Sequence, residues 1–156
     1  IVKERLAVET HYLHEMIDIT DDIISILKRY QIDEGVMTIT SLSDSVGLLI
    51  LEYGRNIIRG VGLLLDEIVS LYKQTDDLDI EGVKETMKRV LTSTTLSLSV
   101  ENYHPVINPT HRIFALESMG PGVKEFAITI IAPSAVDRAV LKLESGREIR
   151  GDDDLL

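Results

Sequence analysis

Residues 18–52 constrain the fold more than any other stretch, because a helical and an extended hydrophobic pattern follow one another there. Thr20 precedes two aspartates, an arrangement that predicts a helix N-cap with acidic side chains at the positive end of the helix dipole. Apolar side chains then recur at helical spacing and predict one buried stripe, formed by Ile23, Ile26, Leu27 and Tyr30. The stretch is therefore expected to begin with an amphipathic helix.

Two strands are predicted after this helix. Asp33-Glu34-Gly35 is typical of a turn, and residues 36–40 alternate between apolar and polar side chains, as a half-buried strand does. Residues 46–51 are apolar on both faces, which favours a central strand covered on both sides. Between the strands lies a short polar insert, Ser43-Asp44-Ser45. These elements favour a mixed α and β architecture.

Alternating patterns predict further strands at both ends of the chain. Residues 2–8 alternate and residues 16–19 form a second β-like run, so the chain is expected to open with a pair of strands. Leu96, Leu98 and Val100 alternate with serines and predict a strand with one buried face. Gly120-Pro121-Gly122 is a strong turn signal, and it predicts a hairpin whose strands are residues 111–119 and 123–131.

More helices are expected in the middle of the chain and near its end. Residues 55–73 predict a long helix with one apolar face, made of Ile57, Val61, Leu64, Ile68 and Leu71. Gly60 and Gly62 weaken such a helix by about 1 kcal/mol each, which indicates close packing against a neighbouring element. A third helix is predicted over residues 79–91, and residues 132–143 suit either a helix or a strand.

Length and composition limit the class of protein. The 156 residues suit one domain, predicted over residues 1–151 with a possible helical insertion at 76–95 and an acidic tail at 152–156. The chain has no cysteine, which excludes thiolate metal sites and nucleophiles. Its net charge of -10 opposes nucleic acid and acidic membrane surfaces. No apolar run approaches the roughly 20 residues that span a bilayer, and a cytoplasmic location is the default expectation.

Several short motifs are placed at the ends of the predicted elements. Asp18-Ile19-Thr20, Glu34-Gly35 and Leu51-Glu52 frame the first helix and the two strands, and Ser145-Gly146-Arg147 is followed by Gly151. In this order they resemble the YjbQ-like family, whose members are often described as secondary thiamine-phosphate synthases. The resemblance covers about half of the chain. It implies an α+β fold with a two-sheet β-sandwich core and flanking helices, a homotrimer, and thiamine-phosphate synthase-like activity.

The chain also departs from the family pattern. Where the family has a histidine and two threonines at the corner before the second strand, this chain has Ser43, Asp44 and Ser45. The residue best suited to act as an acid, a base or a metal ligand is therefore replaced. After Gly151 the family shows Thr-Trp-Gln, whereas residues 152–154 here are aspartates. Residues 18–52 therefore indicate the family fold, but their Ser43-Asp44-Ser45 insert makes the family activity less expected.

The family's second histidine element can be placed in two ways. Asn108, His111, Gly120 and Pro121 preserve its residue types, although the spacing from histidine to glycine is longer than usual. Counting back without gaps from Gly146 instead puts Thr129 at the histidine position, and no family histidine then remains.

The candidate site residues follow from residue type and from this comparison. His104, Asn108 and His111 form a local cluster suited to acid-base chemistry or metal binding, although all three could equally fix turns. Arg55 at the start of the predicted long helix could receive a phosphate, or could belong to a polar helix surface. The predicted catalytic residues are His104, His111 and Glu52, and the predicted ligand-binding residues are Ser43, Asp44, Ser45, Arg55 and Asn108.

Three functional hypotheses follow. In the first, the chain is a divergent family member that keeps the oligomeric scaffold while its synthase-like activity is weakened or lost. In the second, it is an active enzyme that acts on a phosphate-bearing small molecule through its residual histidine, glutamate and arginine side chains. In the third, it is an unrelated α+β binding or structural module. The expected partners are copies of the same chain and a small phosphate-bearing ligand, and no metal or cofactor is specified.

Overall fold

A computed structural model describes residues 1–70, 92–133 and 143–144 of the chain. Over the described ranges it contains the following strands and helices: β1 (Val2–Thr10), β2 (Met16–Asp18), α1 (Thr20–Arg29), β3 (Glu34–Ser41), β4 (Val46–Glu52), α2 (Arg55–Ser70), β5 (Thr95–Glu101), β6 (His104–Pro105), β7 (His111–Glu117) and β8 (Gly122–Ile131). The predicted α+β class is confirmed.

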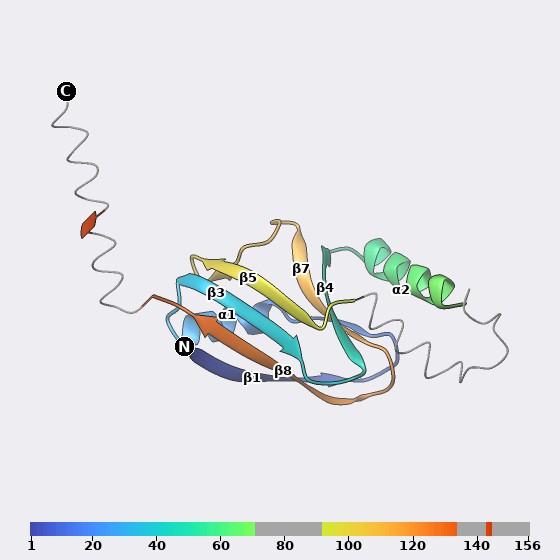
Figure 1. Cartoon of the computed structure of the whole chain (residues 1–156). Helices are drawn as coiled ribbons and strands as arrows, with labels where there is room; N and C mark the ends of the chain where they lie inside the picture. Colours follow the sequence, from blue (N-terminus) through green and yellow to red (C-terminus); the bar gives the residue numbers. More distant parts are fainter. Residues whose placement is uncertain (71–91, 134–142, 145–156) are drawn as a thin grey trace, which may run out of the picture.

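The strands form two antiparallel sheets that share one core. The larger sheet has the order β1-β8-β3-β5-β6, and the smaller has the order β2-β7-β4. Figure 1 shows α1 behind the larger sheet and α2 beside the smaller one. Apolar residues from both sheets and from α1 pack into a single buried cluster that includes Ile23, Leu27, Met37, Ile39, Leu48, Ile113, Phe126 and Ile128. The predicted two-sheet core with flanking helices is therefore present.

The first two strands do not pair with each other, so the strand pair predicted at the start of the chain is wrong. β1 pairs with β8 in the larger sheet, and β2 pairs with β7 in the smaller sheet. The connection at residues 11–15 therefore crosses from one sheet to the other. Alternation of side chains reveals which face of a strand is apolar, but not which strand lies beside it, so the pattern did not distinguish these arrangements.

The predicted hairpin around Gly120 is also wrong, for the same reason. Both strands exist, but β7 lies in the centre of the smaller sheet, whereas β8 lies between β1 and β3 in the larger sheet. The turn at residues 118–121 carries the chain between the sheets.

β4 is an edge strand rather than the predicted central strand. It pairs with β7 on one side, and beyond it the described residues contribute a single bridge between Leu48 and Ser93. Val46 and Leu48 are fully buried, whereas Leu49, Ile50 and Leu51 are only half-buried and Glu52 is exposed. The continuous apolar run reflects burial at one end of this strand, while β7 is the strand buried along most of its length.

α1 starts at Thr20, the residue predicted as its cap, so the N-cap position is Ile19 instead. Thr20 is its first helical residue and makes no capping hydrogen bond; its hydroxyl instead accepts a hydrogen bond from the Ile113 backbone N–H at 2.8 Å. Asp18 Oδ1 accepts the Thr20 N–H at 3.0 Å. The predicted stripe is buried at Ile23, Ile26 and Leu27, whereas Tyr30 lies beyond the helix and is 42% exposed. The threonine thus joins α1 to β7.

α2 extends from Arg55 to Ser70, and Leu65, which is not among the residues of the predicted face, is buried. Ile57 and Leu64 of that face are 39% and 56% exposed. The close packing expected at Gly60 and Gly62 is not found among the described residues, because a Cβ built on either glycine meets no atom of the described chain within 4 Å. Nothing described explains these glycines.

Some sequence predictions fall outside the described residues. These are the helix at 79–91, most of the ambiguous segment at 132–143, the Ser145-to-Gly151 motif and the acidic tail. The domain limits likewise stay predictions. Within the described ranges, no helix is long and apolar enough to cross a membrane.

Candidate functional site

A cavity of about 230 Å³ lies between the start of α1 and the loop that joins β6 to β7. Three residues singled out from the sequence, His104, Asn108 and His111, all line it. The rest of its wall combines polar and apolar groups: Thr20, Ile24, Pro105, Ile107, Pro109 and Arg112. Sequence neighbours that could have served only as turn residues therefore converge on one hollow.

Tight turns hold the cluster in place. Asn102 and Tyr103 adopt left-handed backbone conformations, with φ of 50° and 64°, and reverse the chain so that His104 pairs with Glu101. Asn108 Oδ1 accepts the Thr110 backbone N–H at 3.0 Å and the Thr110 hydroxyl at 2.9 Å. Asn108 therefore has a turn role as well as a place in the cavity wall.

The hydrogen bonds determine the tautomer of each imidazole. His104 Nδ1 lies 2.6 Å from the Asn102 carbonyl oxygen, which can only accept, so Nδ1 must carry the proton. The Thr110 hydroxyl gives its hydrogen to Asn108 and can only accept from His111 Nδ1 at 3.2 Å. In the neutral form both rings therefore have a lone pair on Nε2, and no described residue hydrogen-bonds to it. The two imidazoles of this cavity can therefore each act as a hydrogen-bond acceptor or as a base.

Arg112 is a site residue that sequence reasoning missed. Its Nε donates to Asp18 Oδ2 at 2.7 Å, and its Nη2 lies 3.0 Å from Asp21 Oδ1, so two carboxylates hold the guanidinium. Hydrogen bonding to Asp18 raises the pKa of Arg112. Nη1 has no partner among the described residues and remains able to donate to a ligand. The available signal was the Asp18-Ile19-Thr20 motif, whose aspartate needed a cationic partner.

The carboxylates beside this arginine respond differently to their surroundings. Burial raises the pKa of Asp18, but hydrogen bonds from Arg112 and Thr20 outweigh that effect and hold the pKa below its ordinary value. For Asp22, burial and then the charges of Asp21 and Asp18 raise the pKa. Asp18, which precedes α1, is therefore held in its ionised form, whereas Asp22 in the first turn of α1 ionises less readily.

Glu52 and Arg55 do not line the cavity. Glu52 is directly opposite His111 in the β4–β7 ladder, and its side chain is exposed. Arg55 is the exposed first residue of α2. The roles predicted for these two residues stay predictions.

The Ser43-Asp44-Ser45 corner lies at the other end of the same ladder. Val46 is opposite Glu117, whereas Glu52 is opposite His111, so about 20 Å of strand separates the corner from the His111 end. Ser43 Oγ and Ser45 Oγ are 3.1 Å apart, and the Ser45 carbonyl accepts the Ser118 N–H. The structure does not bring the corner together with His104 and His111, and ligand binding by its residues stays a prediction.

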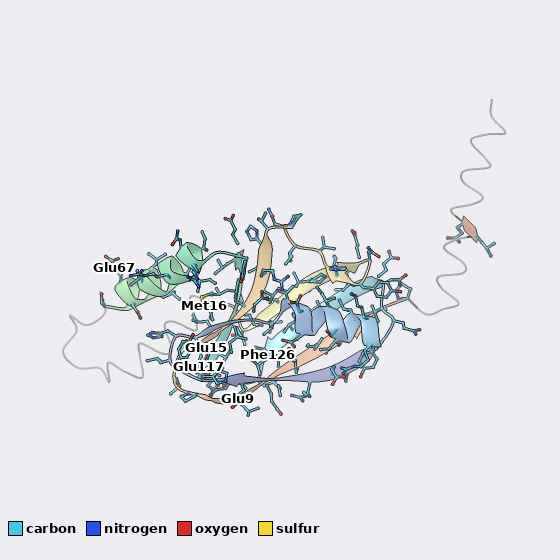
Figure 2. The ribbon with its side chains drawn as sticks, turned by 180° about the vertical axis from the view of Figure 1, so that it is seen from behind. Glu9, Glu15, Met16, Glu67, Glu117 and Phe126 are labelled. Carbon is cyan, nitrogen blue, oxygen red and sulfur yellow. The ribbon has the colours of Figure 1, made fainter. Side chains whose placement is uncertain are left out.

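A buried carboxylate, also missed from the sequence, organises the corner end. Glu117 is fully buried, and it accepts hydrogen bonds from the Thr10 hydroxyl and from the backbone N–H groups of Met119 and Gly120. Lys124 Nζ lies 3.6 Å from Glu117 Oε2, the oxygen that also accepts the Thr10 hydroxyl. Figure 2 shows Glu117 close to Glu15, at the end of the molecule nearer α2. These contacts close the turn between β7 and β8.

The described residues contain no group of three or more histidine, aspartate or glutamate side chains placed to hold a metal ion. The cavity is instead lined by two imidazoles, the Asn108 side chain and the Arg112 guanidinium, beside apolar residues. This mixture suits a small polar ligand and can supply acid-base groups.

The chain matches a family model described as "UPF0047 protein YjbQ-like" over residues 4–133. No curated protein is similar enough in sequence to match.

Solved structures with the same fold come from distant organisms. An uncharacterised conserved protein of the YjbQ/UPF0047 family from Clostridium acetobutylicum is 20% identical, with a TM-score of 0.73 over 82% of this chain and 99% of that one. A protein of unknown function from Sulfolobus solfataricus is 17% identical, with a TM-score of 0.74 over 85% and 97%. A conserved hypothetical protein from Thermus thermophilus is 22% identical, with a TM-score of 0.71 over 82% and 99%. At these identities the likeness shows the fold alone.

Proposed function

The chain belongs to the YjbQ-like family, UPF0047, and we propose that it is a small-molecule-binding member whose thiamine-phosphate synthase-like activity is weakened or lost. The proposed ligand carries a phosphate group and occupies the cavity lined by His104, Asn108, His111 and Arg112. The protein is proposed to keep an oligomeric scaffold, as a homotrimer. The cytoplasmic location and the lack of a nucleic-acid partner remain predictions from the sequence.

The observation that carries this proposal is the arrangement of polar groups in the cavity. Arg112 Nη1 and the Asn108 amide can donate to phosphate oxygens. When the two imidazoles are protonated, their Nε2 atoms can donate as well. The apolar wall at Ile24 and Ile107 suits the organic part of the ligand.

Loss of activity is proposed because the two histidine positions of the family are not reproduced together. The corner has Ser43, Asp44 and Ser45 in place of its histidine and threonines, and it lies at the far end of β4 from His111. A serine without a neighbouring histidine is a poor nucleophile, and the corner supplies no imidazole base.

Calorimetry with thiamine phosphate and with inorganic phosphate tests the binding proposal. We expect His111→Ala and Arg112→Gln each to weaken binding about tenfold, the loss of roughly one hydrogen bond to a charged group. His11→Ala is the matched control, because His11 is exposed and bonds to Glu15 away from the cavity. Equal affinity in the parent and both cavity variants would contradict the proposal.

One observation favours the alternative of an active enzyme. Both Nε2 lone pairs are available in the neutral rings, and a base needs such a lone pair. A synthase assay separates the two functions: no activity above buffer is expected. Turnover in the parent that disappears in His111→Ala would instead establish catalysis at this cavity.

A further inference from the structure

A second hollow, far from the histidine cavity, lies on the larger sheet beside β1. Its volume is about 420 Å³, and it is lined by Lys3, Glu4, Arg5, Tyr30, Ala127, Ile128 and Thr129. We call this hollow the β1 trough. In Figure 1 the outer face of the sheet is turned toward the viewer, opposite the face covered by α1. None of the residues that line the trough lines the histidine cavity, so the trough is separate from the site of the proposed function.

Strand register explains why this part of the sheet is hollow. Lys3 is directly opposite Thr129 and Arg5 is opposite Ala127, so two long cationic side chains stand beside two small ones. The small side chains continue across the sheet, because Thr129 is opposite Thr38 on β3. Thr38 is in turn opposite Ser97 on β5. Neighbouring strands lie about 4.8 Å apart, so a row of hydroxyl groups extends about 10 Å from the Thr129 end.

The two cations have no side-chain partner among the described residues. Neither Lys3 nor Arg5 forms a side-chain hydrogen bond or ion pair within the described chain, whereas Arg29 and Arg112 are both paired with carboxylates. Lys3 and Arg5 are two positions apart on one strand, and their Cα atoms are therefore about 7 Å from each other on the same face. In a chain with a net charge of -10, this leaves a local positive site.

The charges nearby limit the size of the ligand. Glu9 and Glu125 are exposed toward the other end of β1 and β8, so the positive region ends after Arg5. A long polyanion would meet these carboxylates. A single phosphate group would not reach Glu9 or Glu125. Glu4 also lines the trough, but its carboxylate already accepts hydrogen bonds from Arg29 and Tyr30. Guanidinium and ammonium groups both bind phosphate.

From this arrangement we propose that the β1 trough binds a phosphorylated polyol, such as a sugar phosphate. Lys3 and Arg5 hold the phosphate group, and the hydroxyl groups of the ligand lie along the row formed by Thr129, Thr38 and Ser97. No covalent step is involved.

Titration of the full-length, isotope-labelled chain with glucose 6-phosphate, followed by amide NMR shifts, tests this proposal. Shifts are expected at residues 3–5, 127–129 and 38, and not at residues 104–112. The double variant Lys3→Gln/Arg5→Gln is expected to bind about tenfold more weakly, because it removes two attractive charges close to the phosphate. Lys28→Gln is the matched control, since Lys28 is an exposed cation on α1, behind the sheet.

Three further comparisons make the test decisive. Thr129→Val removes one hydroxyl and is expected to weaken binding of glucose 6-phosphate but not of inorganic phosphate. Equal affinity for both ligands in the parent would overturn the polyol part of the proposal. Shifts confined to residues 104–112, or unchanged affinity in the double variant, would overturn the trough itself, whereas failure of the histidine cavity to bind phosphate would leave the trough unaffected.

Discussion

The pair formed by Arg112 and Asp18 fixes the edge of the histidine cavity. Sequence position gave no direct sign of it, because the two residues are 94 positions apart and meet only when β2 pairs with β7. His104, Asn108 and His111, by contrast, could be found from residue type, since they lie within eight positions of one another. Short-range clusters are therefore visible in a sequence, whereas a partner that arrives from another strand is not.

Asp18→Asn is expected to lower the free energy of unfolding by about 1–2 kcal/mol at neutral pH, because it removes a charge-assisted hydrogen bond to a partly buried arginine. The folded pKa of Asp18 is below its ordinary value, so this contribution is present above the ordinary carboxylate pKa and disappears as the pH falls through the folded value. Urea unfolding at neutral pH and below about pH 3 measures the difference, which is expected to shrink at the lower pH.

Asp21→Asn provides the matched comparison on the same guanidinium. Asp21 is 83% exposed, so its ion pair with Arg112 is screened by water and is expected to contribute less than about 1 kcal/mol. If Asp21→Asn proves as costly as Asp18→Asn, the difference in burial does not control the strength of these two contacts.

Glu117 is the most buried carboxylate among the described residues, and its replacement tests how much the corner end depends on it. Glu117→Gln keeps the shape but turns one acceptor into a donor and removes the charge opposite Lys124. Breaking such a buried pair is expected to cost about 3 kcal/mol of unfolding free energy. Thermal and urea unfolding measure it, with Glu125→Gln on the exposed face of β8 as control. Equal stability of the two variants would show that Glu117 is not essential to the turn.

At the level of elements, local periodicity identified the strands but not their neighbours. β3 and β5 were predicted within one or two residues, because each alternates over its whole length. The pairing of β1 with β8 and of β2 with β7 was missed, since those partners are separated by most of the chain. The edge position of β4 was missed for a related reason. An apolar run indicates that a strand is buried, but an edge strand that packs against the core can be buried as well.

Gly35 and Gly60 give opposite expectations for the same substitution. A Cβ at Gly35 would lie 2.5 Å from the Ile131 carbonyl oxygen, a backbone atom of the paired strand, so Gly35→Ala must push β3 away from β8. It is expected to destabilise the fold by about 1–3 kcal/mol. Gly60→Ala meets no described atom within 4 Å and improves helix propensity, so it is expected to stabilise α2 by about 0.5–1 kcal/mol.

Unfolding midpoints of the two alanine variants check both signs in one experiment. A destabilised Gly60→Ala protein would indicate that α2 packs closely against another surface in solution, as the glycines first suggested. A neutral Gly35→Ala protein would indicate that the end of β3 separates from β8 at little cost.

At the scale of the whole molecule, the likeness carried by the frame of residues 18–52 predicted the sandwich that periodicity alone could not. Pattern arguments led to a mixed α and β domain, and the resemblance supplied the two sheets. The position of the site did not follow from either. The frame contains both Ser43 and Glu52, but the strand between them separates the two ends, and the cavity forms at the end that Arg112 and α1 complete. A frame that resembles a family therefore indicates the fold more firmly than it locates the chemistry.

The proposed trimer also belongs to this scale, and α2 is the element expected to contribute to it. Ile57, Leu63 and Leu64 are 39%, 61% and 56% exposed over the described structure, although they are large apolar side chains. A second copy of the chain could cover them and so remove apolar area from water. Light scattering coupled to size-exclusion chromatography is expected to give the mass of three copies of the 17.4 kDa chain.

Leu64→Glu should shift this mass toward the monomer, because burying an unpaired carboxylate in an apolar interface is strongly unfavourable. Arg59→Glu places the same charge on an exposed polar position of α2 and should leave the assembly intact. A monomeric parent would refute the trimer. A Leu64→Glu protein that remains trimeric would instead move the interface away from α2, most simply onto a sheet face, and the outer face that contains the β1 trough would then have to be tested for burial between subunits.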